Sequence, residues 1–224
     1  MRYLAGLTAG ILLLVGYPGI AAAGNVDTAL DLAKLLRSSR TVIALNQSLI
    51  NDSSRGDKGL TGRRVIDEAL KIFRKRTGRD APLNDNATVR GRLLRAQSAA
   101  IVEVVDEHQT TINKAGVAFK GFVPAVFARL VNERFKQKIG KYAEIKVTAP
   151  LELVRNRKAR PDAWERAALA EKLASAGWPK GKLYSERADN RGRKAFRVLV
   201  PEYYGKGCLS CHGSPKGEID ITGY

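Results

Sequence analysis

The sequence contains few residues of the kinds that bind metals or form covalent cross-links. Among its 224 residues are two cysteines, two histidines and one methionine, the initiator Met1. With so few cysteines the chain is not a disulfide-stabilised scaffold, and burial of apolar groups must supply its stability. It also lacks internal repeats, low-complexity segments and, after residue 23, any apolar run long enough to cross a bilayer. Residues 24–224 are therefore predicted to form a single domain with a substantial core.

Both cysteines lie in one short motif near the C-terminus. The motif reads Cys208-Leu209-Ser210-Cys211-His212. Two thiols at this spacing can add to the two vinyl groups of one haem, and the histidine that follows then becomes the proximal ligand of the iron. The sequence predicts one covalent haem c, attached through Cys208 and Cys211, with His212 as the iron ligand.

Three other kinds of site share this spacing. A zinc site needs two further thiolate or imidazole ligands, and the only other histidine, His108, has no candidate ligand near it in the sequence. A thioredoxin-like pair follows a strand of a βαβ unit at the start of a helix, whereas Tyr203, Tyr204 and Gly205 precede this motif. A structural disulfide is the third alternative. Haem attachment is favoured over all three.

The N-terminus has the pattern of a secretory signal peptide, residues 1–23. Arg2 gives a positive start, Leu4 to Ile20 is mostly apolar, and the three alanines that end at Ala23 are small residues of the kind that a signal peptidase recognises. A retained membrane anchor is the alternative, but two glycines and a proline interrupt the run, and a span needs about 20 apolar residues. We expect cleavage after Ala23 and a periplasmic protein, because haem is joined to CxxCH motifs outside the bacterial inner membrane.

The chain is strongly basic, with a formal net charge of +17. Such a surplus often indicates binding to nucleic acid or to an anionic surface. Here Lys plus Arg exceed Asp plus Glu by 12 to 8 over residues 24–87, 11 to 5 over 88–150 and 15 to 9 over 151–224. Since the surplus is spread out and export removes contact with the genome, we expect no nucleic acid. Attraction to lipid head groups or to an acidic redox partner is expected instead.

The periodicity of apolar residues predicts an α+β fold. Residues 24–115 are expected to be mostly helical, with helices over about 26–50, 61–77 and 86–113. Residues 116–224 are expected to be mixed, and their predicted elements are a strand or extended segment over 117–122, a helix over 124–139, a strand over 144–148, a helix over 161–176, and two strands over 183–186 and 194–200 joined by a turn. The last strand leads directly into the CxxCH motif.

A series of short motifs runs through most of the mature chain. In order they are Asn46-Gln47, Ile50-Asn51-Asp52, Phe119-Lys120-Gly121-Phe122-Val123-Pro124, Lys146-Val147-Thr148, Arg155-Asn156, Arg160-Pro161-Asp162-Ala163-Trp164-Glu165, Pro201-Glu202-Tyr203-Tyr204 and the single CxxCHG. Together they resemble the Tll-type haem-c sensor-domain family. The resemblance implies a PAS-like antiparallel sheet with flanking helices and a long N-terminal helical region. It also implies a secreted or extracytoplasmic module that reports redox state or small gaseous ligands.

The sixth ligand of the iron decides between electron transfer and binding of a small molecule. The thiolate ligand of the best-known family members cannot be carried over, because there is no third cysteine, and loss of Met1 with the signal excludes methionine. His108 is the candidate distal ligand, since it lies four residues from both Val104 and Ile112 on the apolar side of its predicted helix. For His108 itself the alternatives are a partly buried histidine bonded to a backbone carbonyl or a surface histidine. The iron would then have water, a Tyr, Asn or Lys side chain, or no sixth ligand.

Other residues are candidates for the haem pocket. Aromatic residues expected to pack against the porphyrin, with ordinary core positions as the alternative, are Phe119, Phe122, Trp164 and Tyr203 or Phe196. Basic residues that are candidate partners of the propionates, with a solvated surface position as the alternative, are Arg155, Arg197 and Lys146.

Three functional classes follow from these features. The first is a periplasmic haem-binding domain that senses redox state or a small ligand and passes its signal to a separate partner protein. The second is a periplasmic electron-transfer cytochrome with one haem. A haem enzyme such as a peroxidase is disfavoured because it usually needs a distal base and often a second haem. We therefore do not expect an enzyme.

Overall fold

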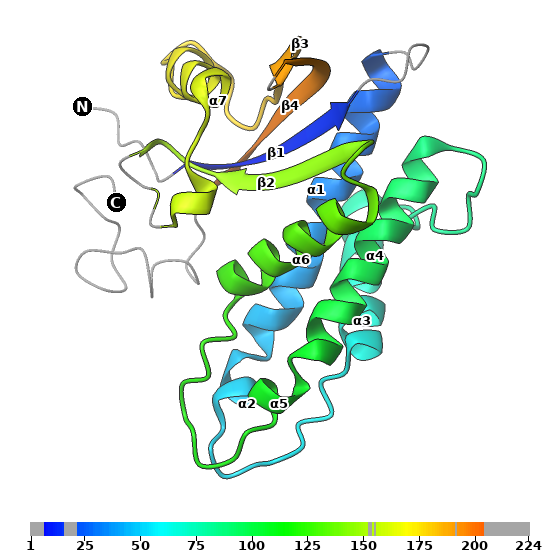
Figure 1. The fold of residues 1–224 in the computed structure, drawn as a ribbon, viewed down its shortest axis with the longest axis vertical. Helices are drawn as coiled ribbons and strands as arrows, with labels where there is room; N and C mark the ends of the chain where they lie inside the picture. The colour runs from blue at the N-terminus through cyan, green and yellow to red at the C-terminus, as the bar shows by residue number, and fades with distance from the viewer. Residues whose placement is uncertain (1–6, 16–21, 152–153, 155, 191, 204–224) are drawn as a thin grey trace. The chain divides into compact units, whose positions relative to one another are not determined.

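A computed structural model describes residues 7–15, 22–151, 154, 156–190 and 192–203. The chain forms two compact units, one made of residues 30–144 and the other of residues 1–29 with 145–224. We call them the helical unit and the mixed unit. The combination of helices with a sheet confirms the α+β fold class (Figure 1).

The helical unit is a bundle in which α1, α3, α4 and α6 run beside one another (Figure 1). Its helices are α1 (Ala22–Leu45, which begins in the mixed unit), α2 (Gln47–Asn51), α3 (Gly62–Thr77), α4 (Val89–Glu107), α5 (Gln109–Ile112) and α6 (Pro124–Ile139). The four longer helices, α1, α3, α4 and α6, each contribute a stripe of buried apolar side chains, among them Leu35, Phe73, Ile101 and Phe135, which are all fully buried. This is the arrangement expected when each helix places one apolar face in a shared core.

Two of the predicted helices have the expected limits, and two are divided. The side chain of Thr61 accepts a hydrogen bond from the backbone of Arg64 at the start of α3, and Gly78 ends that helix in a left-handed conformation with φ of 72°. α6 begins at Pro124 and ends at Ile139, as predicted. The helix expected over 86–113 is divided at His108 into α4 and α5, and the one expected over 26–50 into α1 and α2.

The segment over residues 117–122 is not a strand. Its backbone has no regular secondary structure, so the prediction of a strand there was wrong, and the alternative of an extended segment stays a prediction. Gly116 and Gly121 on either side of its centre have φ of 75° and 70°. A left-handed residue redirects an extended chain, and two of them within a few residues prevent continuous ladder pairing.

The mixed unit contains a four-stranded sheet in the order β2-β1-β4-β3. Its elements are β1 (Leu7–Val15), β2 (Ala143–Thr148, whose first residues belong to the helical unit), a short helix η2 (Arg157–Ala159), α7 (Ala163–Ala167), a π-helical segment η3 (Ala168–Leu173), β3 (Tyr184–Asn190) and β4 (Arg193–Tyr203). β4 pairs antiparallel with both β1 and β3. The predicted terminal hairpin is therefore confirmed, with strands longer than expected.

Strand β4 is one of the two interior strands of the sheet and leads toward the CxxCH motif. All its residues from Ala195 to Pro201 are buried. A strand that is covered on both faces reads as a continuous apolar run, and Ala195 to Val200 is such a run apart from Arg197. A single arginine in such a strand needs a buried partner, because an unpaired charge there is costly.

Strand β1 lies within the segment that the sequence predicts to be a signal peptide. It lies between β2 and β4, and Leu7 to Val15 pair with Tyr203 to Ala195 in antiparallel order. Cleavage after Ala23 would remove β1 and leave β3 as the described neighbour of β4. Within the described part of the chain, no helix combines the length and apolar character that a membrane span requires.

Candidate functional site

The predicted haem-binding residues Cys208, Cys211 and His212 lie outside the described residues, as does Arg155. The structure describes β4 as far as Tyr203, five residues before Cys208. The candidate site is therefore built from the part of the mixed unit that surrounds β4.

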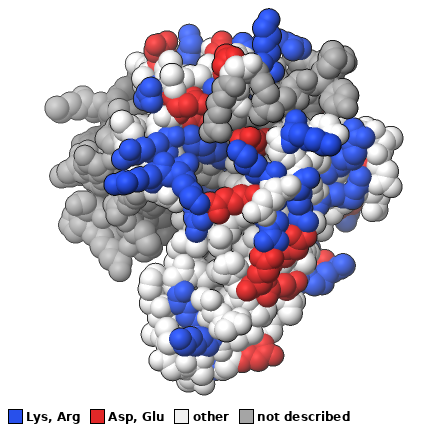
Figure 2. Space-filling model, viewed as in Figure 1, with Lys and Arg blue, Asp and Glu red and all other residues white. Residues whose placement is uncertain are grey.

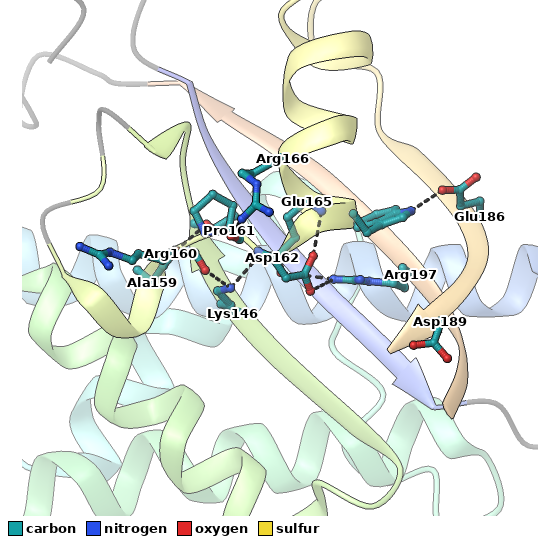
Figure 3. Close-up of polar contacts among 12 residues, drawn as sticks. Lys146, Ala159, Arg160, Pro161, Asp162, Glu165, Arg166, Glu186, Asp189 and Arg197 are labelled. Carbon is teal, nitrogen blue, oxygen red and sulfur yellow. Dashed lines mark hydrogen bonds and ion pairs between the residues drawn. The ribbon is translucent and has the colours of Figure 1, made fainter. Parts of the chain in front are cut away.

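Four charged side chains form a cluster beside β4 (Figure 3). Lys146 comes from β2, Asp162 and Glu165 from the start of α7, and Arg197 from β4. We call them the charge cluster. Glu165 and Arg197 are each 1 % exposed. These two groups have left water almost completely, so the ion pairs within the cluster must offset the loss of their hydration.

The contacts in the charge cluster connect three separate segments of the chain. Arg197 Nη2 donates a hydrogen bond to Asp162 Oδ2 at 2.7 Å and lies 3.4 Å from Glu165 Oε1. Lys146 Nζ donates to Glu165 Oε2 at 2.7 Å and also to the carbonyl oxygen of Arg160. The cluster thus holds the first turn of α7 against β2 and β4.

The start of α7 explains why two carboxylates lie at this point. Asp162 and Glu165 form a capping box, in which Asp162 Oδ1 accepts from the Glu165 backbone at 2.9 Å and Glu165 Oε2 accepts from the Asp162 backbone at 2.7 Å. The amides at a helix N-terminus favour carboxylates. The same two carboxylates therefore begin the helix and receive the cations from the sheet.

The guanidinium of Arg197 also lies over an aromatic ring. Its carbon is 4.2 Å from the ring centre of Trp164, within the range of a cation–π contact. Trp164 Nε1 donates to Glu186 of β3, and the ring of Trp164 stacks on Tyr184 with 5.8 Å between centres. Arg197 Nε is buried without a hydrogen-bond partner among the described residues. Arg197 is thus fixed by carboxylates at Nη2 and by an indole on one face.

The structure changes the interpretation of Lys146 and Arg197. Both were candidate partners of haem propionates, with a solvated surface as the alternative. Arg197 is not a surface residue, and the described ion-pair partners of both side chains are carboxylates at the start of α7. Two features of the sequence indicate such a cluster: a lone arginine in an apolar run and an Asp-x-x-Glu pair at the start of a helix. Neither feature reveals which residue the arginine or the carboxylates will pair with.

His108 lies in the helical unit, at the end of α4. Its Nδ1 is 2.7 Å from the carbonyl oxygen of Val104, and its ring centre is 5.3 Å from that of Phe122. The side chain is half-buried and bonded to a backbone carbonyl, as one of the alternatives predicted. Donation from Nδ1 leaves Nε2 as the nitrogen that can act as a ligand. Distal ligation by His108 stays a prediction.

The aromatic candidates are divided between the two units. In the helical unit Phe122 is buried against Phe127, whereas Phe119 is 70 % exposed. In the mixed unit Trp164 and Tyr203 are partly buried and pack against Ala168, Leu169 and Leu199. Phe196 is a core residue of β4, 5 % exposed. Their contact with a haem stays a prediction.

The charge cluster should make the mixed unit sensitive to acid. Although burial raises the pKa of Asp162, its hydrogen bonds with Arg197 and the Glu165 backbone outweigh that effect and lower the pKa below the ordinary value of 3.8. Its stabilising contribution is complete above the unfolded-state pKa and is lost as the pH falls through the lower folded-state pKa. We expect the free energy of unfolding to fall more steeply between about pH 5 and about pH 2 for the wild type than for Asp162→Asn. Denaturant titrations along this range test it, and equal slopes would contradict it.

These features define an α+β protein in which a partly buried charge cluster adjoins the strand that leads to a CxxCH motif. The chain belongs to the Tll0287-like family, whose model, Tll0287, matches residues 79–224. The match covers the charge cluster, β3, β4 and the CxxCH motif. No curated protein and no solved structure matches the chain.

Proposed function

We propose that this protein is a periplasmic haem c protein and serves as a redox or small-ligand sensor-type module. The observation that carries the proposal is the CxxCH motif of a chain that belongs to the Tll0287-like family. Cys208 and Cys211 would form the thioether links, and His212 would bind the iron. The bound haem would supply a one-electron redox change and an axial position for a ligand.

The described residues around the end of β4 suit such a group. Cys208 is five positions after Tyr203, a stretch of chain that spans at most about 18 Å, so the attachment lies within that reach of β4. Beside this point the partly exposed rings of Trp164, Tyr184 and Tyr203 pack on a buried apolar cluster. Porphyrin faces need apolar packing, and the donor set of two thiols and one imidazole is the one that haem c uses.

The charge cluster supports a sensor role. Arg197 of β4 is paired with the first turn of α7, and α7 continues into the π-helical segment η3. π-helical turns inside helices occur frequently at functional sites. A displacement of β4 that follows a change at the haem would therefore act directly on α7 and η3, which we propose as the output element.

An electron-transfer cytochrome is the second candidate. The formal net charge of +17 favours it, since long-range attraction speeds encounter with an acidic redox protein. The two candidates differ in how the reduced protein treats small ligands. CO binding with slow electron exchange supports the sensor, and fast exchange without CO binding supports the carrier.

The test is retention of haem by the denatured protein. Protein produced with a haem c maturation system should begin at Gly24, carry the mass of one haem through acid-acetone extraction, and show a haem c spectrum. The double variant Cys208→Ser/Cys211→Ser should lose all covalent haem, because no thiol remains to form a thioether. The matched variant Ser210→Ala keeps both thiols and should retain haem. Extraction of all haem from the wild type would refute the proposal.

A further inference from the structure

Three aromatic and three basic residues form one surface of the mixed unit. The ammonium of Lys172 lies 5.9 Å from the ring centre of Tyr184, that of Lys180 lies 5.0 Å from Tyr203, and that of Lys182 lies 5.1 Å from Trp178. Trp178 also meets Tyr184 edge to face, with 5.9 Å between ring centres. We call these six residues the lysine–aromatic surface.

The three lysines differ from many basic residues of the protein in their lack of ion pairs with described carboxylates. Ion pairs join Lys136 to Glu144, Lys138 to Glu103, and Arg134 to both Glu103 and Glu107. Among the described residues, no carboxylate forms an ion pair with Lys172, Lys180 or Lys182. Figure 2 shows that basic side chains cover much of the viewed face, some of them beside acidic ones. The three ammonium groups are therefore open to an acidic partner, although Glu186 and Glu171 lie near the hydroxyl of Tyr184.

The rings of this surface are held in place by hydrogen bonds. Trp178 Nε1 donates to the carbonyl oxygen of Lys182 at 2.8 Å, and the backbone of Gly181 donates to the Tyr203 hydroxyl at 2.9 Å. The pKa of the Tyr184 hydroxyl is raised, mainly because burial disfavours the phenolate and also because the hydroxyl forms a hydrogen bond with Glu186. This phenol therefore stays neutral. Rigid aromatic rings in fixed positions lose little conformational entropy when a partner covers them.

The surface lies beside the strand that leads to the CxxCH motif. Tyr203 is the last residue of β4, and the Gly181 contact ties the 178–182 segment to it. Because the chain between Tyr203 and Cys208 spans at most about 18 Å, a partner that contacts Tyr203 lies within about that distance of Cys208. Such a partner would be close to the haem attachment.

We propose that the lysine–aromatic surface is the docking site for an acidic redox protein, which exchanges electrons with the haem. The inference rests on the covalent haem of the proposed function and on its second candidate, electron transfer, and it names the redox partner of the same site. Aromatic residues are enriched at the centres of protein interfaces, and surrounding charges steer the encounter with a partner of opposite sign. Small, transient interfaces of this composition suit electron transfer, in which the partner must leave after each exchange. A protein partner is favoured over a membrane because hydrogen bonds hold the rings in a rigid face and do not leave them free to insert among head groups.

A charge-matched pair of triple variants tests the proposal. The test variant is Lys172→Gln/Lys180→Gln/Lys182→Gln, and the control is Lys71→Gln/Lys75→Gln/Lys114→Gln, which removes three exposed lysines from the helical unit. The probe is poly-L-glutamate, with binding measured at low and at high salt. We expect the test variant to bind about tenfold more weakly at low salt, and the control to bind within about twofold of the wild type.

Electron exchange provides the second measurement. Reduced holoprotein is mixed with ferricyanide, an anionic oxidant, or with a cationic cobalt complex. The test variant should react several-fold more slowly with ferricyanide and no more slowly with the cation, while the control keeps the wild-type rates. Trp178→Ala should weaken poly-L-glutamate binding without changing its salt dependence, because it removes apolar contact and leaves the charge.

Specific outcomes would overturn the proposal. Equal losses in the test and control variants would show that net charge alone governs binding. Binding to vesicles of anionic lipid that is lost in the test variant, without binding to poly-L-glutamate, would assign the surface to a membrane. Covalent haem is measured in every sample, so a wild type without haem refutes the proposed function, whereas poly-L-glutamate binding still reports on the surface.

Discussion

Replacing Arg197 by alanine is expected to lower the free energy of unfolding by about 3–5 kcal/mol. The reason is that Arg197 is almost completely buried and is the described cation paired with Asp162, while it shares Glu165 with Lys146. Its loss leaves Glu165 buried with one cation and removes the group that covers the Trp164 ring. Removing one partner from a buried ion pair costs more than the pair itself contributes, because the remaining buried charge, here Glu165, keeps only Lys146 as a described cation to offset its lost hydration.

Chemical denaturation of protein that retains β1 measures this effect, because Leu13 of β1 pairs with Arg197 in the described sheet. Arg187→Ala is the matched control, since Arg187 lies on the neighbouring strand β3 and is exposed. It should change stability by less than about 0.5 kcal/mol. Arg197→Lys should recover only part of the loss, because an ammonium cannot present the planar fork that meets Asp162 and lies over Trp164. A change below about 1 kcal/mol for Arg197→Ala would show that the charge cluster does not hold α7 to the sheet.

The double variant Arg79→Ala/Arg90→Ala is expected to destabilise the helical unit by about 3–5 kcal/mol. Asp31 of α1 has a side chain only 1 % exposed, and it accepts hydrogen bonds from Arg79 at 2.6 Å and from Arg90 Nε at 2.8 Å. Removing both arginines leaves a buried carboxylate without its partners. Asp31→Ala should cost less, about 1–2 kcal/mol, because the side chains of Arg79 and Arg90 are 45 % and 29 % exposed and can turn to water.

The critical observation is whether the double variant loses more unfolding free energy than Asp31→Ala does. Denaturation curves of the double variant, of Asp31→Ala and of the exposed control Arg92→Ala provide it. A greater loss of unfolding free energy in Asp31→Ala than in the double variant would contradict the prediction that an unpaired buried carboxylate costs more than two unpaired, partly exposed arginines. Hydrogen exchange adds spatial resolution. The amides of α1 and α4 should lose protection in the double variant, whereas those of β4 should lose it in Arg197→Ala.

Several elements could be predicted because local chemistry specifies their ends. α6 has the expected limits since Pro124 suits the first turn of a helix and Gly140 follows its last residue. The break at His108 could not be predicted, because apolar spacing continues across it. At this point the imidazole Nδ1 of His108 donates a hydrogen bond to the carbonyl oxygen of Val104, which the His108 amide would bind in a continuous helix. The amide instead donates to the carbonyl oxygen of Val105. A side chain thus replaces a main-chain hydrogen bond, and spacing alone does not reveal such a substitution.

The sequence by itself determined the CxxCH motif and the haem chemistry that it predicts, because thioether attachment depends on the spacing of adjacent residues and not on the surrounding fold. It also determined the helical first half and the terminal hairpin, since apolar periodicity and turn residues act over short distances. Only the tertiary structure decided that Lys146, Glu165 and Arg197 meet. Arg197 and Asp162 are 35 positions apart, and their pairing depends on how β4 is placed against the start of α7. Buried charges find their partners through packing, which spacing along the chain does not encode.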